Sequence, residues 1–317
     1  MFSKLFSRVR QIAIVMFAGG WLIAASLAQA DALDAVEPCF NFLNAQDYVR
    51  AKNAAIALLE RNDLSREAQR AAYLCLGNAY DNMGHTRDAL SAFQQVETLS
   101  QTARELAFAY NYLGSAYSNL NELDRAELYD QRALKVFREL GDHKSDEAAA
   151  LNNLAGVVEE RGDIERALQL YQESLELQTD EAKKPSTINN IALIYAKRGK
   201  FNKAVEMLRE AIAIDQRNGD AHGTARRKAS LGNILGKNKQ WDAAEKELTE
   251  ALNTLRLIGD KDGEVRTYQL FAKLEEARGK RTAARHWYEQ AETVFREVGQ
   301  TTRADKMRDA AAKIKGE

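Results

Sequence analysis

Paired asparagines offer the clearest chemistry in this sequence of 317 residues. Asn152 and Asn153 stand side by side in the string LNNLA, and Asn189 and Asn190 repeat the arrangement in INNIA. In a helix interior Asn is less favourable than Ala by roughly 0.6 kcal/mol, so helix formation alone does not explain these pairs. An Asn side chain offers two donors and an acceptor, which match the acceptor and donors of a peptide backbone. The pairs are suited either to binding an extended peptide or to bonding the backbone of their own chain.

The composition predicts that helices position these residues. Apolar residues make up 45% of the chain and charged residues 29%, which is typical of a folded protein rather than a disordered one. The chain contains only two prolines, and good helix formers such as Ala, Leu, Glu, Arg, Lys and Gln dominate it. We therefore predict an all-α protein.

The N-terminal segment has a different character. It begins with the basic residues Lys4, Arg8 and Arg10 and continues with QIAIVMFAGGWLIAASLAQA, which carries no charge and ends in a small-x-small motif. These features are typical of a secretory signal peptide, which we predict at residues 1–30. We then expect an exported chain, periplasmic or extracellular, with no membrane insertion after cleavage. The alternative is an uncleaved anchor, because about 20 apolar residues can span a bilayer.

The net charge gives no reason to expect nucleic acid as a partner. The whole chain carries a formal charge of −1. Because residues 1–30 hold three positive charges and no negative one, the cleaved chain would carry −4. Binding to phosphates needs a basic face, and a mildly acidic chain does not predict one.

An internal repeat organises the rest of the chain. A polar residue, two further residues and Ala recur every 37 to 41 residues, with the alanine at Ala51, Ala89, Ala126, Ala167, Ala204, Ala244 and Ala284. Twelve residues before six of these alanines stands another small residue: Gly77, Gly114, Ala155, Ala192, Gly232 and Ala272. Three or four residues after the alanine stands a large one: Phe93, Tyr129, Tyr171, Leu208, Leu248 and Tyr288. Between the two small residues the chain often carries a glycine suited to a helix C-cap, namely Gly84, Gly162, Gly199 or Gly279. Each unit is therefore predicted to be a helix, a tight turn and a second helix.

This spacing resembles that of the tetratricopeptide repeat family. A large residue three positions after the first small one, as at Tyr80, Tyr117 and Tyr195, belongs to the same signature. The resemblance covers about Ala35 to Gly299, with units longer than the usual 34 residues. In their length and in the string LNNLA the units are similar to kinesin-light-chain repeats. The resemblance implies a right-handed superhelical solenoid of about seven antiparallel helix-pair repeats with a C-terminal capping helix.

The pattern divides the chain into four segments. Residues 1–30 are the signal peptide, residues 31–70 a degenerate N-terminal repeat or cap, residues 71–300 a solenoid of six repeats, and residues 301–317 the C-terminal capping helix. The first repeat is degenerate because Pro38 falls within its first helix and Cys39 takes the small position. Since proline is tolerated only in a helix's first turn, this helix is predicted to begin near Glu37 or to be kinked.

The resemblance also implies a concave groove lined by the first helix of each pair. Ten residues are then expected to face the groove as candidate peptide-binding residues: Asn78, Asn82, Asn111, Tyr112, Asn119, Asn152, Asn153, Asn189, Asn190 and Asn233. A ladder of asparagines can pair with an extended peptide whatever its side chains are, while neighbouring pockets select those side chains. The competing interpretation is structural, with each Asn bonding the adjacent unit, because a buried polar group without a partner costs ~1–3 kcal/mol.

Cys39 and Cys75 are the only cysteines of the chain. In an exported protein an even number suggests a disulfide, which here would join the N-terminal cap to the next unit. The alternative is two buried thiols, since a free cysteine packs as a small hydrophobe. A bridge requires the two Cα atoms to lie about 4.4–6.8 Å apart.

These features lead us to expect a non-enzymatic, exported interaction scaffold that binds an extended peptide segment of a partner protein in its groove. The alternative is a structural scaffold of an envelope complex, which assembles with itself or with other subunits through terminal or convex surfaces. No catalytic motif such as G-x-S-x-G, H-E-x-x-H or a P-loop occurs, and the four histidines share no metal-ligand spacing. No cofactor and no metal are therefore expected.

Overall fold

The computed structural model describes residues 35–141 and 144–314, and the predicted signal peptide lies outside these ranges. Within them the chain forms fifteen α-helices, one short 3₁₀ helix and no strand. None of these helices has the length and apolar character needed to cross a membrane. In chain order the elements are α3 (Glu37–Asn44), α4 (Tyr48–Leu59), α5 (Arg66–Asn82), α6 (Thr86–Leu99), α7 (Ala103–Asn119), α8 (Leu123–Leu140), α9 (Lys144–Glu160), α10 (Ile164–Leu177), η1 (Glu181–Lys183), α11 (Lys184–Lys197), α12 (Phe201–Arg217), α13 (Ala221–Lys237), α14 (Trp241–Leu257), α15 (Lys261–Ala277), α16 (Arg281–Glu297) and α17 (Thr301–Lys313).

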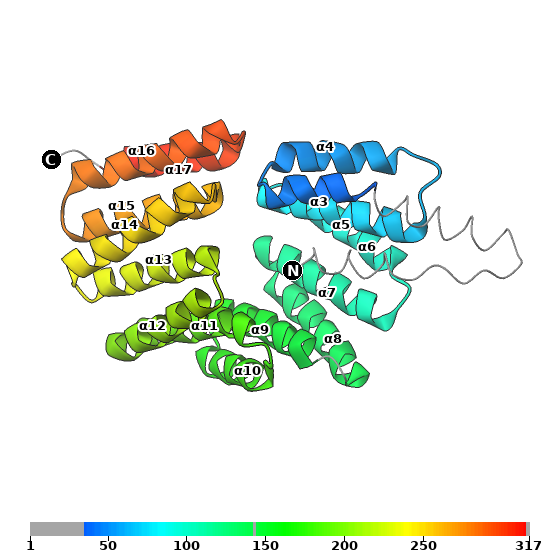
Figure 1. Ribbon diagram of the computed structural model, residues 1–317, viewed down its shortest axis with the longest axis horizontal. Coiled ribbons are helices and arrows are strands. Elements are labelled where there is room, and N and C mark those ends of the chain that lie inside the picture. Colours follow the sequence, from blue (N-terminus) through cyan, green and yellow to red (C-terminus); the bar gives the residue numbers. More distant parts are fainter. Residues whose placement is uncertain (1–34, 142–143, 315–317) are drawn as a thin grey trace, which may run out of the picture.

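The helices pair into seven hairpins, from α3–α4 to α15–α16, and α17 follows as a single last helix (Figure 1). The two helices of a hairpin pack on each other, and each hairpin packs on the next, so the chain is one continuous solenoid. In Figure 1, α10 and α12 lie on the outside of the curve, whereas α9 and α11 lie on its inside. The predicted all-α solenoid of helix pairs is confirmed, while its right-handed sense stays a prediction.

Every hairpin turn contains one residue with a positive φ angle, which ends the first helix. Four of the seven are the predicted glycines Gly84, Gly162, Gly199 and Gly279, with φ between 74° and 90°. The other three are Gln46, Asn121 and Lys239, with φ of 57°, 61° and 60°. Asn is enriched in this conformation, but Gln and Lys are uncommon there, so the residue type does not mark the turns at Gln46 and Lys239.

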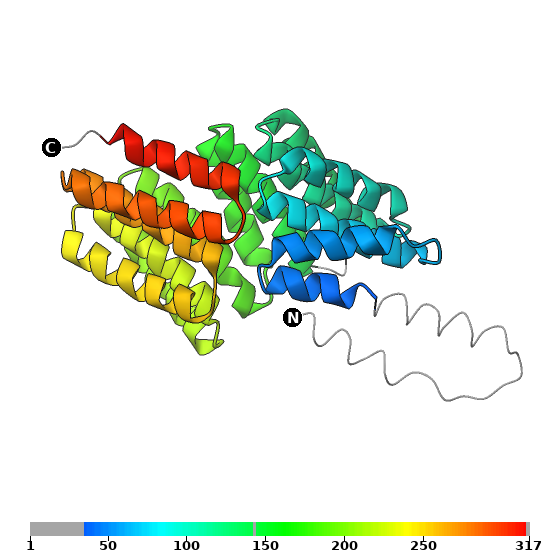
Figure 2. The ribbon, with the colours of Figure 1, turned by 90° about the horizontal axis from the view of Figure 1, so that it is seen from above.

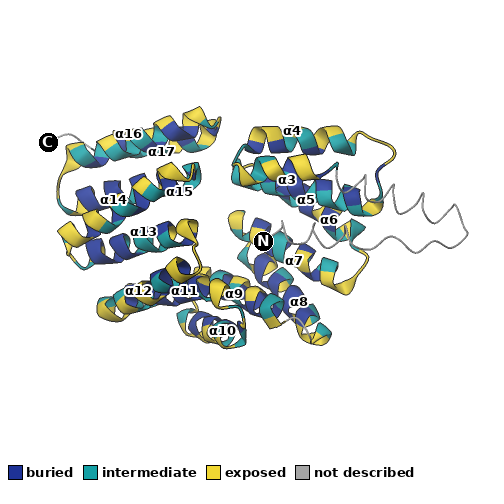
Figure 3. Cartoon of the chain, in the orientation of Figure 1, coloured by how far each residue is buried: buried dark blue, intermediate teal, exposed yellow. Residues whose placement is uncertain are grey.

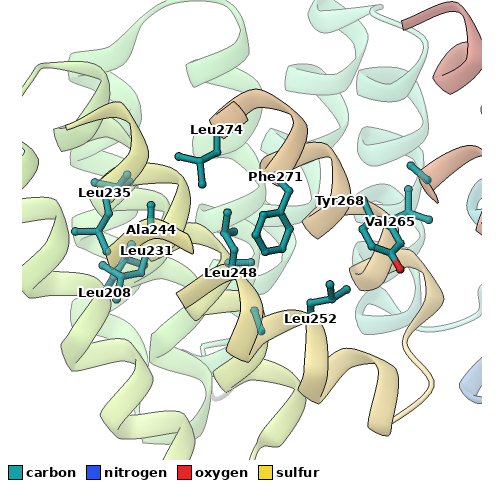
Figure 4. Close-up of a cluster of buried hydrophobic side chains, with 14 of the residues drawn as sticks. Leu208, Leu231, Leu235, Ala244, Leu248, Leu252, Val265, Tyr268, Phe271 and Leu274 are labelled. Carbon is teal, nitrogen blue, oxygen red and sulfur yellow. The ribbon is translucent and has the colours of Figure 1, made fainter. Parts of the chain in front are cut away.

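Small residues let the two helices of a hairpin approach closely. The repeated alanines Ala51, Ala89, Ala126, Ala167, Ala204, Ala244 and Ala284 are all completely buried. Where the first small position is glycine, a neighbouring side chain fills the space of the missing Cβ, since a Cβ on Gly77 would clash with Phe93 and one on Gly232 would lie 2.7 Å from Leu248. Figure 3 shows the buried residues between the packed helices, and Figure 4 shows the cluster that contains Leu248 and Phe271.

A disulfide joins the first hairpin to the second. Helix α3 begins at Glu37 and carries Pro38 in its first turn, in agreement with the sequence prediction. Cys39 of α3 is bonded to Cys75 of α5, with a Cα–Cα separation of 6.4 Å, and both residues are completely buried. Because the bridge links residues 36 positions apart, the chain-entropy model gives a stabilisation of about 4 kcal/mol.

The two ends of the solenoid meet, which closes it into a ring. Gln46, in the turn of the first hairpin, donates from Nε2 to Asp260 Oδ1 at 2.9 Å and accepts from the backbone N–H of Lys261 at 2.9 Å. The Tyr48 hydroxyl donates to Asp262 Oδ2 at 2.7 Å. Figures 1 and 2 both place the first hairpin beside the last helices. The repeat pattern did not predict this closure.

Candidate functional site

A cavity of about 510 Å³ lies where α7 and α9 run next to each other. Its lining consists of Phe108, Asn111, Tyr112, Ser115, Ser118, Asn119, Asp130, Asn152, Asn153, Gly156, Val157, Glu160, Tyr171 and Asn190. Six of the ten predicted peptide-binding residues are among them, namely Asn111, Tyr112, Asn119, Asn152, Asn153 and Asn190. The structure therefore brings more than half of the predicted residues together in one site.

Helical periodicity brings these side chains to one face of each helix. On α7 the residues Phe108, Asn111, Tyr112 and Ser115 follow the spacing i, i+3, i+4 and i+7, which places them on a common stripe. The start of α7 is fixed by a capping box, in which the Thr102 side chain accepts from the Glu105 backbone N–H and the Glu105 carboxylate accepts from that of Thr102. On α9 the residues Asn153, Gly156, Val157 and Glu160 repeat this spacing, and Asn152 stands next to Asn153.

The asparagines at the cavity are partly engaged within the chain and partly free. Asn152 Oδ1 accepts hydrogen bonds from Asn190 Nδ2 and from Thr187 Oγ1, each at 3.2 Å. This pairing links α9 to α11, as the structural interpretation expects. Among the described residues, no hydrogen bond reaches the side chains of Asn111 and Asn153, and Asn111 Oδ1 is buried without a partner. One member of the first pair thus joins neighbouring helices, while the other remains available to a ligand.

Four of the ten candidates lie outside the cavity, and Asn119 lines it but bonds another residue of the chain. Asn78 and Asn82 donate to the backbone carbonyls of Leu74 and Asn78 in their own helix, at 2.7 and 2.8 Å. Asn189 contacts Asn190, and Asn233 of α13 is not part of the cavity lining. Asn119 lines the cavity but donates to Asp81 at 2.9 Å.

Asp130 of α8 is the residue of the site that the sequence interpretation missed. The repeat pattern assigned the large core residue of this unit to Tyr129, but the structure leaves Tyr129 half-buried and places Asp130 in the core, 1% exposed. Asp130 Oδ1 occupies the space of the Cβ that Gly114 lacks and has no hydrogen-bond partner among the described residues. Burial raises the pKa of this carboxyl to about 8. A strict alignment at four residues after Ala126 would have found it.

The charges around the cavity have one sign. Asp130 and Glu160 are the carboxylic acids among its lining residues, and none of these residues is Lys, Arg or His. The aromatic rings of Phe108, Tyr112 and Tyr171 complete the lining. In the part of the chain that the structure describes, no group of three His, Cys, Asp or Glu side chains could hold a metal ion. The site therefore offers hydrogen bonds, aromatic faces and negative charge to a ligand.

Comparison with known proteins agrees with this architecture. A tetratricopeptide repeat family model matches residues 105–180, 185–253 and 227–297, which together make up more than half of the chain. The chain belongs to the tetratricopeptide repeat family. No sequence among the curated proteins matches it.

Several solved structures share the fold at low sequence identity. A Rap protein complexed with competence and sporulation factor is 12% identical with a TM-score of 0.60, covering 90% of this chain and 98% of its own. The apo form of the quorum sensor NprR from B. thuringiensis is 14% identical with a TM-score of 0.57, covering 99% and 92%. Aspartyl phosphate phosphatase F from Bacillus subtilis is 11% identical with a TM-score of 0.53, covering 95% and 96%. At these identities the likeness is one of fold.

Proposed function

We propose that this chain is a non-enzymatic interaction scaffold that binds an extended segment of a partner protein on the inner face of its ring. The observation that carries the proposal is the cavity between α7 and α9, which is lined by Asn111, Asn119, Asn152, Asn153 and Asn190. Amide side chains can pair with a peptide backbone through both their donors and their acceptor. Like this chain, the Rap protein complexed with competence and sporulation factor has a helical-repeat fold, which supports a binding role.

The proposal depends on the amides that have no partner in the chain. Asn111 and Asn153 make no hydrogen bond among the described residues, so they are free to bond a peptide. Asn152 lines the same cavity, while its oxygen accepts hydrogen bonds from Thr187 and Asn190 of α11. The structural role and the binding role are therefore divided between neighbouring side chains.

Selection from a displayed library of random 12-residue peptides would test this function. We expect the full-length chain to enrich peptides whose affinity falls at least about tenfold in the double variant Asn111→Ala, Asn153→Ala, because two hydrogen bonds are lost. The matched control is Asn78→Ala, Asn82→Ala, whose amides bond their own helix. If the first variant keeps its affinity but its melting temperature drops by many degrees, the ladder is structural and the proposal fails.

A second function, self-assembly, is favoured by one exposed apolar feature. Leu257 is 86% exposed and the adjacent Ile258 43% exposed, at the C-terminal end of α14. A self-assembling scaffold would bury this pair between copies of the chain. Size-exclusion chromatography with light scattering distinguishes the two functions, since self-assembly requires an oligomer that Leu257→Glu converts to a monomer.

We also propose that the chain is exported. Residues 1–30 have the basic start, apolar stretch and small-x-small end of a signal peptide. The disulfide between Cys39 and Cys75 supports this, because such bonds persist in oxidising compartments. Mass spectrometry of the protein from fractionated cells should find an N-terminus at Asp31. A protein that begins at Met1 in the membrane fraction would instead support an uncleaved anchor.

A further inference from the structure

The repeat that lines the cavity departs from the other repeats at one core position. Four residues after the buried alanine, the second helices of five other hairpins carry a large apolar or aromatic side chain: Phe93, Tyr171, Leu208, Leu248 and Tyr288. In α8 the same position holds Asp130. The substitution occurs in the hairpin whose first helix, α7, forms one wall of the cavity.

Packing does not account for an acid at this position. Asp130 is 1% exposed, and its Oδ1 has no hydrogen-bond partner among the described residues. Burial of a polar group without a partner is unfavourable, and a leucine such as Leu248 fills the equivalent space in α14. The carboxyl group therefore lowers stability where it stands, and it is one of the groups that line the cavity.

The cavity contains hydrogen-bond acceptors that a ligand with hydrogen-bond donors would satisfy. Asn111 Oδ1 is a second buried acceptor without a partner, and Glu160 adds a second carboxylate to the lining. No lining residue supplies a positive charge, and the rings of Tyr112 and Tyr171 add faces that attract cations. A group with several N–H donors and a positive charge would satisfy these acceptors together.

We propose that this cavity receives a lysine or arginine side chain of the bound segment, and that its charged head contacts Asp130. This inference rests on the proposed function and specifies which residue class the site selects. The asparagines of α7, α9 and α11 line the cavity and bind the backbone of the segment. Asp130, which is buried, contacts one side chain of the segment. The N-terminal ammonium group of a partner has the same chemistry, so the test must separate the two sources.

The experiment uses a displayed library of random 12-residue peptides with fixed Gly-Ser flanks, so that the random stretch has no free N-terminus. Selection on the full-length chain should enrich Lys or Arg at one fixed position. Peptides synthesised from the enriched sequences, with free or acetylated N-termini, are then titrated by fluorescence anisotropy. Acetylation should leave the affinity unchanged, whereas replacement of the basic residue by Gln should lower it at least about tenfold.

The matched variants are Asp130→Asn, Asp130→Leu and Asp215→Asn. Asp130→Asn keeps the shape of the side chain and should bind the basic and the Gln peptides equally, and Asp130→Leu should do the same. Asp215 of α12 is also buried, 2% exposed, and lies outside the cavity, so Asp215→Asn should bind as the wild type does.

The outcomes separate this inference from the proposed function. Enriched peptides without a fixed basic residue, or equal affinity in wild type and Asp130→Asn, would overturn the role of Asp130 while peptide binding stands. Loss of affinity on acetylation alone would assign the site to an N-terminal ammonium and reject the side chain. Enrichment of no peptide at all would reject both proposals.

Discussion

The hairpins α7–α8 and α13–α14 share a backbone arrangement but fill it with opposite chemistry. Both carry glycine at the first small position, Gly114 and Gly232, and in both a side chain of the second helix enters the space of the missing Cβ. In α14 this side chain is Leu248, completely buried in the cluster of Figure 4. In α8 it is Asp130, whose Oδ1 has no hydrogen-bond partner among the described residues. The same position of the repeat can therefore hold an apolar residue that packs in the core or an acid that can bind a ligand. Only the apolar residue stabilises the fold.

The first helices of the two regions also carry different residues at an equivalent position. Six residues before the small position, α7 carries Phe108, whereas α13 and α15 carry Arg226 and Arg266. Partial burial and the nearby guanidinium groups of Arg266 and Arg227 lower the pKa of Arg226. An aromatic ring at this position in α7 thus corresponds to guanidinium groups in α13 and α15.

The largest effect is expected when an acid is placed at the equivalent core position of the hairpin α13–α14. Leu248→Asp removes a completely buried leucine and leaves a carboxyl group in an apolar cluster. We expect the free energy of unfolding to fall by about 4 kcal/mol or more, since the loss of leucine packing alone is worth roughly 2–5 kcal/mol. Urea denaturation followed by circular dichroism measures this change. A wild-type midpoint would show that the position tolerates acids in general.

The reciprocal change should stabilise the protein. Asp130→Leu gives α8 the residue that α14 already has beside its glycine. We expect the free energy of unfolding at pH 7 to rise by about 4 kcal/mol, because the unfolded chain no longer gains the free energy of ionising this aspartate, about 1.4 kcal/mol for each pH unit above ~3.9. Thermal melts of the variant and the wild type measure the gain. A lower melting temperature for Asp130→Leu would mean that the acid has a partner that stabilises it.

The protonation of Asp130 makes the stability of the protein depend on pH. Native Asp130 keeps its proton up to about pH 8, whereas an unfolded aspartate loses it near pH ~3.9. Between these values the native state binds more protons, so the free energy of unfolding falls by about 1.4 kcal/mol per pH unit as pH rises. The cavity also contains the titratable groups of Tyr112, Glu160 and Tyr171.

Asp130→Asn removes this contribution and leaves those three groups in place. The stability difference between the variant and the wild type should therefore grow from about pH 4 to pH 8 and then stay level. Urea midpoints across this range provide the measurement. A difference that does not change with pH would show that Asp130 is ionised in the native protein throughout.

The smallest effect is expected where the two ends of the solenoid meet. Gln46→Ala removes the two hydrogen bonds to Asp260 and Lys261. We expect a loss of only about 1 kcal/mol, since each bond contributes modestly to stability. Small-angle scattering should show a larger radius of gyration only when Tyr48→Phe is added, because the Tyr48 hydroxyl otherwise still donates to Asp262 across the same contact. The control Gln94→Ala, on the exposed surface of α6, should change neither quantity.

The sequence predicted the repeating features of the fold and missed those that occur once. The small-residue spacing indicated the helix pairs, and the turn glycines Gly84 and Gly162 marked hairpin turns. Ring closure escaped prediction because it joins Gln46 to Asp260, 214 residues away, through contacts that no other repeat makes. A periodic pattern reports only what its units have in common.

The sequence also predicted part of the candidate site. The asparagine pairs recur, so they were visible, and six of the ten predicted residues line the cavity. Asn78 and Asn82 did not join them, because a helix offers an Asn side chain the carbonyl four residues earlier. Asp130 was overlooked because Tyr129, its neighbour, satisfies a looser version of the pattern.

The contact between Gln46 and Asp260 has a mechanical consequence for any partner. An open solenoid of helix pairs can change its pitch through small shifts between neighbouring hairpins, whereas this chain cannot do so while its first hairpin is bonded to residues 214 positions away. A partner that needs a wider spacing of the hairpins must therefore break the hydrogen bonds of Gln46 first, and its affinity falls by their contribution.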